Sequence, residues 1–206
     1  MKRQRVRGET LIGLLVGLSL GLLVLAAGTR MLAQHLRSHR LNLQDSHLNH
    51  DLRNALDLMT RELHRSQYVA NAWATRSPTA CRDPFCDGAE DFSIQGNRIA
   101  FGHDRNHNGQ QDNNECLGFR LVSGALQSRT ACWPETWVAL TDPLSLQVTG
   151  LSWQLQCTPR SGWLHRAVTL TLSGQWPKEP TRSISLSQTI HLHNDLPAAV
   201  QTLYCP

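Results

Sequence analysis

The chain has few aromatic and few charged residues. Phe, Trp and Tyr together make up 6% of its 206 residues, and charged residues make up 17%. Hydrophobic residues make up 40%, which supports a modest core and excludes wholesale disorder. A chain of this length holds one ordinary domain plus one long additional element rather than two full domains.

Most of the chain carries no net charge. The formal net charge is +4 at pH 7, and four basic residues without an acidic neighbour lie among the first seven: Lys2, Arg3, Arg5 and Arg7. The remainder is therefore neutral. Because nucleic-acid binding depends on a positive patch that attracts phosphate, we exclude nucleic acid as a partner.

Enzyme motifs are missing as well. The sequence contains no GxSxG, no HExxH, no P-loop and no dinucleotide-binding fingerprint. Its ten histidines are scattered. His191 and His193 alternate on one expected strand, and we interpret them as a solvated face rather than as a metal pair. We expect a protein that is not an enzyme.

A long apolar run follows the basic residues. The run from Leu11 to Ala27 contains no charge. As a helix from Glu9 to Gly28 it would be roughly 30 Å long, which matches the core of a bilayer. The positive-inside rule keeps the basic residues in the cytoplasm and places everything after Arg30 on the far side. This predicts a single pass through a bacterial inner membrane, with a periplasmic head.

Glycines recur within the apolar run. Gly13, Gly17 and Gly21 are spaced four residues apart, so they share one face of a helix. Such a GxxxGxxxG stripe allows a second membrane helix to approach closely. The ordinary glycine content of membrane helices produces the same spacing, so a specific packing face and simple bending both remain open.

All cysteines lie in the part predicted to be exported, and there are six: Cys81, Cys86, Cys116, Cys132, Cys157 and Cys205. An even number in an oxidising compartment favours disulfides. A zinc site is the alternative, but no CxxC pair occurs. Cys116 and Cys132 lie symmetrically about Gly124, so a hairpin turning there would bring them together. Among the many pairings that six cysteines allow, we prefer Cys81–Cys86, Cys116–Cys132 and Cys157–Cys205.

The residues after the apolar run remain helical in pattern but become amphipathic. Apolar residues recur at intervals of three and four: Leu48, Leu52, Ala55, Leu56, Met59 and Leu63. No proline occurs between Glu9 and Ser77. The pattern therefore predicts one continuous helix of about 55 to 60 residues, with its last part packed on a head.

Beyond Pro78 the sequence changes to short alternating strands. Phe92 to Ile94 and Ile99 to Phe101 flank Gly96-Asn97, which is typical of a hairpin. Further apolar alternation occurs around residues 117–121, 168–172 and 184–192. We predict an α+β fold in which an antiparallel sheet covers the amphipathic half of the long helix.

One segment fits a calcium-binding loop. Residues 104–115 match D-x-[DN]-x-[DN]-G-x5-E at every specified position. Calcium prefers six to eight oxygen ligands, and Gly109 permits the sharp turn between them. Strands rather than helices are expected to flank the loop, which favours a structural clamp over a sensor. The alternative is a polar, solvated hairpin tip. The predicted Ca²⁺ ligands are Asp104, Asn106, Asn108, the carbonyl of Gln110, Asp112 and Glu115.

The amino terminus resembles the type IV prepilin family, in which a short basic leader ends in glycine and the apolar helix is retained. The matching stretch runs from Arg7 to Val16. The resemblance implies cleavage between Gly8 and Glu9 by a prepilin peptidase, followed by methylation of the new amino group. Glu9 replaces the usual phenylalanine. Gly13 replaces the glutamate that pairs with a neighbouring subunit, which suggests a priming or tip subunit, with drift in a paralogue as the alternative.

The resemblance continues along the chain. The segment from Met59 to Tyr68 is similar to the helix end of PilW-type and prepilin peptidase-dependent B-type minor pilins, with Ser66-Gln67 in place of Ala-Gly. The segment from Asp104 to Cys132 is also similar to the B-type proteins. The fold implied is that of a type IV pilin, and the partners implied are prepilin peptidase, the inner membrane, other minor pilins or pseudopilins, and the major pilin.

These observations divide the chain into four segments: a leader at 1–8, a transmembrane and filament-core helix at 9–29, its amphipathic continuation at 30–70, and a disulfide-linked β-rich head at 71–206. We expect a minor pilin of type IV pilus assembly. Three alternatives remain: a type II secretion minor pseudopilin, a membrane-anchored calcium-binding adhesion module, and a secreted hydrolase whose mature chain starts near Gln34.

Overall fold

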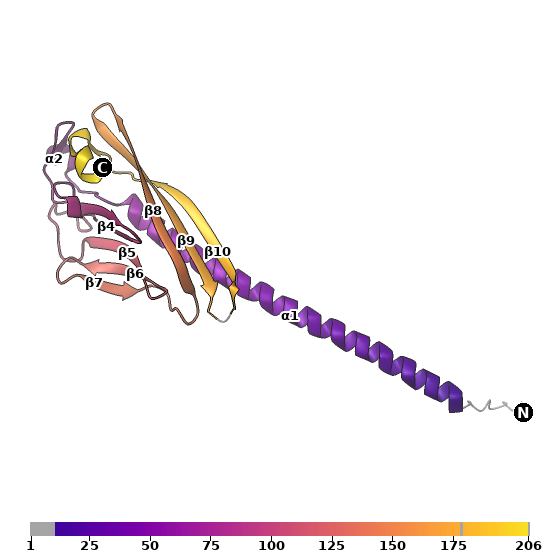
Figure 1. Cartoon of the computed structure of the whole chain (residues 1–206). Helices are drawn as coiled ribbons and strands as arrows, with labels where there is room; N and C mark the ends of the chain where they lie inside the picture. Colours follow the sequence, from indigo (N-terminus) through magenta and orange to yellow (C-terminus); the bar gives the residue numbers. More distant parts are fainter. Residues whose placement is uncertain (1–10, 178, 206) are drawn as a thin grey trace, which may run out of the picture. The chain divides into compact units, whose positions relative to one another are not determined.

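A computed structural model describes residues 11–177 and 179–205. It confirms the predicted α+β class, with one long amino-terminal helix followed by antiparallel sheets (Figure 1). Helix α1 runs without interruption through Leu11–His64, 54 residues, as the lack of proline predicts. The chain divides into two compact units, residues 1–47 and 48–206, so the division falls inside α1. The four predicted segments remain predictions.

The longest strands form one sheet of the head. Its strands are β8 (Gln147–Arg160), β9 (Trp163–Trp176), β10 (Glu179–His191) and the short β11 (Leu196–Pro197). β9 is central, with β8 on one side and β10 and β11 on the other, all antiparallel (Figure 1). One face of β9 is buried, and on the other face serine and threonine hydroxyls of β9 and β10 pair across the strands at 2.9–3.1 Å.

Five shorter strands form a separate meander in the order β3-β4-β5-β6-β7. They span Phe92–Gln95, Arg98–Gly102, Cys116–Val122, Ala125–Ala131 and Thr136–Ala139. The predicted hairpin is present, with Ile94 opposite Ile99. Gly96 has a φ of +59°, which glycine adopts at low cost. The expectation of one sheet is corrected, because these short strands pair among themselves and not with β8–β10.

Short elements fill the connections of the head. They comprise α2 (Ala72–Thr75), the two-residue strands β1 (Arg76–Ser77) and β2 (Ala80–Cys81), the 3-10 turns η1 (Ala89–Asp91) and η2 (Ala198–Val200), and α3 (Gln201–Tyr204). β1 pairs with β2 in a small sheet of their own.

The core of the head gathers residues from α1 and from both large sheets. Leu48, Leu52, Met59 and Leu63 of α1 are at most 1% exposed, and they belong to one buried cluster with residues of β4, β5, β6, β8, β9 and β10. These buried residues are among the apolar residues that recur at intervals of three and four in the sequence. The second part of α1 is therefore the central element of the head.

Candidate functional site

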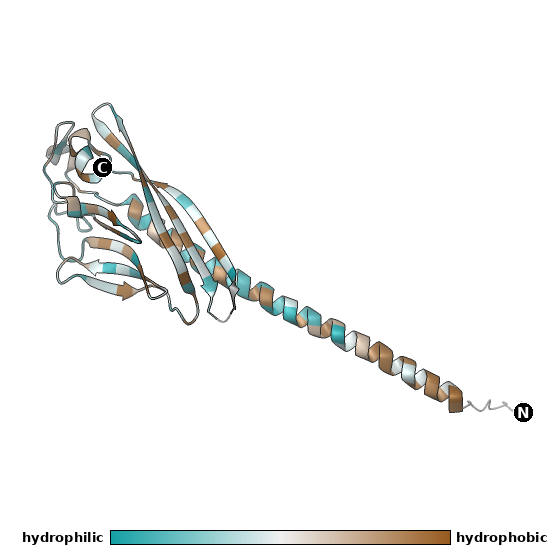
Figure 2. Ribbon diagram, in the orientation of Figure 1, coloured by the Kyte–Doolittle hydropathy of each residue, from teal (hydrophilic) through white to brown (hydrophobic). Residues whose placement is uncertain are grey.

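The first part of α1, residues 11–47, presents large apolar side chains to its surroundings. Among the described residues of this part, the most apolar 18-residue window has none of its residues buried. Leu11, Leu14, Leu18 and Leu25 are each 60–78% exposed. Figure 2 shows hydrophobic residues predominating near the start of the helix, with hydrophilic residues interspersed further along it. By length and composition it fits a single-pass membrane anchor.

The glycine stripe lies within this apolar part. A Cβ added at Gly17 or Gly21 would meet no atom within 4 Å, so neither glycine is required by packing inside this chain. Gly13 lies two residues after the helix begins at Leu11. The predicted processing residues, Gly8 and Glu9, lie outside the described residues.

All six cysteines are paired in the structure. The pairs are Cys81–Cys86, Cys116–Cys132 and Cys157–Cys205, with Cα–Cα distances of 6.0, 4.9 and 6.2 Å. They are the same three pairs that the sequence favours. Cys116 and Cys132 meet because β5 and β6 form a hairpin around Ser123-Gly124.

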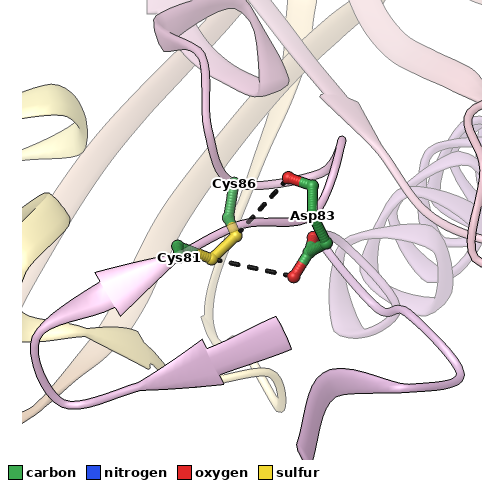
Figure 3. A group of neighbouring side chains, drawn as sticks. All are labelled: Cys81, Asp83 and Cys86. Atoms are coloured by element: carbon green, nitrogen blue, oxygen red, sulfur yellow. Dashed lines mark hydrogen bonds between the residues drawn. A yellow bond between two sulfur atoms is a disulfide. The ribbon is translucent and has the colours of Figure 1, made fainter. Parts of the chain in front are cut away.

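Cys81 and Cys86 lie next to a carboxylate. The potential ligand atoms of Cys81, Asp83 and Cys86 lie within 4.8 Å of one another, and no other such cluster of three occurs among the described residues (Figure 3). Because the two sulfurs are bonded to each other, neither offers a thiolate, and the cluster does not fit a zinc site. The dashed contacts of 3.7 Å therefore join disulfide sulfurs to oxygens of Asp83 (Figure 3).

The Asp83 carboxylate instead pairs with an arginine. Arg76 Nε lies 2.7 Å from Asp83 Oδ2, and the two side chains are only 3% and 1% exposed. Arg76 Nη2 also donates to the carbonyl of Gln67 at 2.7 Å. The pair thus fixes the first residues after α1 against the small disulfide loop.

Gln67, three residues after the end of α1, contacts several of the buried polar groups in this region. It is fully buried and has a φ of +56°. Its side chain donates to the carbonyl of Phe85 at 2.8 Å and accepts from the buried guanidinium of Arg166. The sequence carries one signal for this role, since the resemblance to B-type minor pilins implies glycine at position 67, and glycine is the residue that favours a positive φ. The partners Arg76, Asp83 and Arg166 come from distant segments and were not predicted.

The predicted calcium loop joins β4 to β5. Strands do flank it, as expected. Asp104 and Glu115 are 1% and 0% exposed. The amides of Asn106 and Asn108 both donate to Asp112 Oδ2, at 2.7 and 2.9 Å. Gly109 has a φ of +74°. Gln110 is exposed, and its backbone N–H donates to Asn108 Oδ1 at 2.8 Å.

The loop does not bring its three carboxylates together in the geometry of a closed ion site. Asp104, Asp112 and Glu115 do not form a cluster with ligand atoms within 4.8 Å of one another in the described part of the chain. The amides of Asn106 and Asn108 occupy positions beside Asp112 instead.

A long apolar amino-terminal helix that continues into an antiparallel β-rich head defines a pilin-like protein. The family model described as prepilin peptidase-dependent protein B matches residues 41–192, which is most of the chain. The chain belongs to this family, and with it to the prepilin peptidase pathway. Comparison with curated proteins and with solved structures finds no match.

Proposed function

We propose that this chain is a minor pilin that takes part in type IV pilus assembly and acts by packing against other subunits rather than by catalysis. One observation carries the proposal: the apolar side chains of the first part of α1 are exposed, while the same helix forms the centre of the head. Exposed apolar surface of this extent requires another cover. Membrane lipid before assembly and neighbouring pilin helices afterwards provide it.

Processing by prepilin peptidase is the first step of this function. We infer that cleavage between Gly8 and Glu9 removes the basic leader and leaves the apolar helix at the new amino terminus. The leader resemblance supports this step, and the family assignment agrees with it. The glycines of the apolar run would then face other helices, where a missing side chain permits close contact.

Processing is tested with the full chain in cells with and without prepilin peptidase. We expect a mature chain that starts at Glu9 only where the peptidase is present, and none for Gly8→Ala. Gly28→Ala is the matched control, because a Cβ at Gly28 meets no atom within 4 Å. A mature chain that begins well downstream of the apolar run, or one that forms equally from Gly8→Ala, contradicts the proposal.

A priming or tip position follows from Gly13. A carboxylate inside a membrane is costly unless a partner neutralises it, and a subunit without a neighbour on that side gains nothing from it. Deleting the chain should therefore reduce pilus number sharply although few copies are present. Gly13→Glu should not raise pilus number above that of the unmodified chain; a rise argues for an internal position.

The same deletion separates the pilus from type II secretion. Normal pilus number together with loss of protein secretion would assign the chain to a pseudopilus. Loss of pili with normal secretion supports the proposal. Both phenotypes are scored in one strain, with the intact chain restored as the control.

A further inference from the structure

We propose that the loop from Asp104 to Glu115 binds a calcium ion. The ligands are side-chain oxygens of Asp104, Asn106, Asn108, Asp112 and Glu115, with the carbonyl of Gln110. Their order and spacing match the twelve-residue calcium loop at each specified position. The proposal does not depend on the assembly role.

The two ends of the loop hold buried carboxyl groups. The carboxylates of Asp104 and Glu115 have no cationic side chain within ion-pair distance in the described part of the chain, although both residues are at most 1% exposed. Backbone N–H groups of Ala70, Asn108 and Gly109 donate to the Asp104 carboxylate at 3.0–3.1 Å. A divalent cation would supply the positive charge that no side chain supplies here.

The middle of the loop already holds three of the ligands at hydrogen-bond distance. Asn106 Nδ2 and Asn108 Nδ2 lie 2.7 and 2.9 Å from the same oxygen of Asp112. Turning each amide about its χ2 angle exchanges its nitrogen for its oxygen, so that both amides and Asp112 offer oxygen to one ion. The turn also breaks the hydrogen bonds that Asn106 Oδ1 and Asn108 Oδ1 accept from the backbone N–H groups of Asn108 and Gln110, at 3.1 and 2.8 Å. His107 and Gly109 have positive φ values of 63° and 74°, which give the sharp turn that the loop pattern requires.

A second observation points to a hydrated ligand at the same place. His103 and Asp104 line one cavity of about 520 Å³ together with Tyr68 and His107. His103 is 4% exposed, and its Nδ1 has no hydrogen-bond partner among the residues that the structure describes. A neutral ring nitrogen can accept a hydrogen bond from water held by a cation, and calcium commonly retains such water.

The flanking structure makes the site a clamp. β4 and β5 pair through five residues on each strand, and Cys116, directly after Glu115, is joined to Cys132. Strands held in this way cannot open as the helices of a calcium sensor do. Three carboxylates give a modest affinity, so we expect a Kd of about 10⁻⁴ to 10⁻³ M, typical of extracellular modules.

The test uses the full chain in detergent micelles. Terbium luminescence is excited through Tyr68, which lines the same cavity, and CaCl₂ is then added to displace the terbium; calorimetry with CaCl₂ alone gives the stoichiometry. We expect one calcium per chain and at least tenfold weaker binding in Glu115→Gln and Asp112→Asn. Asp142→Asn is the matched control, since Asp142 Oδ1 accepts from Leu144 N at 2.9 Å in an unrelated turn.

Four outcomes would overturn the proposal. The proposal is wrong if calcium binding does not saturate at several millimolar CaCl₂, or if MgCl₂ binds with equal affinity. It is also wrong if binding is unchanged in the two loop variants. Arg65 and Arg105 also line the cavity, so inorganic phosphate is titrated separately, and binding of phosphate without calcium assigns an anion site instead. If Glu115→Gln does not fold, the partly exposed Asp112→Asn decides the outcome.

Discussion

The two parts of α1 share one backbone but differ in what covers them. In residues 48–64 the apolar side chains are buried by the sheets of the head, and in residues 11–47 apolar side chains of the same kinds are exposed. The helix itself is continuous through both. The helix is therefore continuous whether or not residues of the head bury its apolar side chains. The exposed part is suited to contact lipid and other helices. The following predictions test how sharply the two parts differ.

The largest effect is expected at the junction where α1 ends. Asp83→Ala leaves the buried guanidinium of Arg76 without its partner, so the head should lose about 3–5 kcal/mol of unfolding free energy. All six tryptophans lie in the head, so their fluorescence during urea unfolding of the full chain reports the head alone. Glu135→Ala removes the partner of Arg98 and Arg129, and the Glu135 side chain is 37% exposed, so the change should cost about 1 kcal/mol or less. Equal losses would contradict the account.

A pair of leucine variants compares the two parts directly. Leu52→Ala removes a fully buried side chain, and we expect a loss of about 2–5 kcal/mol from the head. Leu22→Ala removes a side chain that is 59% exposed, and the unfolding free energy of the head should not change. Both variants place alanine in the same helix. A loss with Leu22→Ala would show that the first part stabilises the head.

The smallest effect is a pH dependence confined to the head. Burial raises the pKa of Asp91 to about 7, outweighing the lowering effect of the hydrogen bond from Gly88 N. The folded state holds the Asp91 proton more tightly than the unfolded state does. The stability that Asp91 contributes to the head is therefore fully present below its unfolded pKa and is lost as the pH rises through about 7. Head stability relative to Asp91→Asn should therefore fall between about pH 4 and 7. A flat difference would show that Asp91 is ionised throughout.

Local patterns in the sequence predict much of this fold. The spacing of Leu48, Leu52 and Met59 gives the buried face of α1, and Gly96-Asn97 gives the hairpin. The symmetry of Cys116 and Cys132 about Gly124 gives a disulfide. Each signal lies within one element or one turn, where the period of a helix or the geometry of a hairpin fixes which residues meet.

Long-range partners were not predicted. Arg166 reaches Gln67 across 99 residues, and Arg76 meets Asp83 only because the chain reverses after α1. The division into two sheets was missed for the same reason, since strand alternation shows which side chains are buried but not which strands pair. For the proposed calcium site, the sequence supplies the order of the candidate ligands, and the structure adds the buried carboxyl groups and His103.

The central claim is that neighbouring pilin-like helices cover the first part of α1. Photo-crosslinking in piliated cells tests it, with the crosslinking residue placed at Leu14, which is 60% exposed. Leu144, an 83% exposed residue of the head, is the comparison position. The account predicts that mass spectrometry identifies adducts between position 14 and the apolar helix of another prepilin-like chain. Adducts with lipid alone at position 14, in cells that assemble pili, would contradict it.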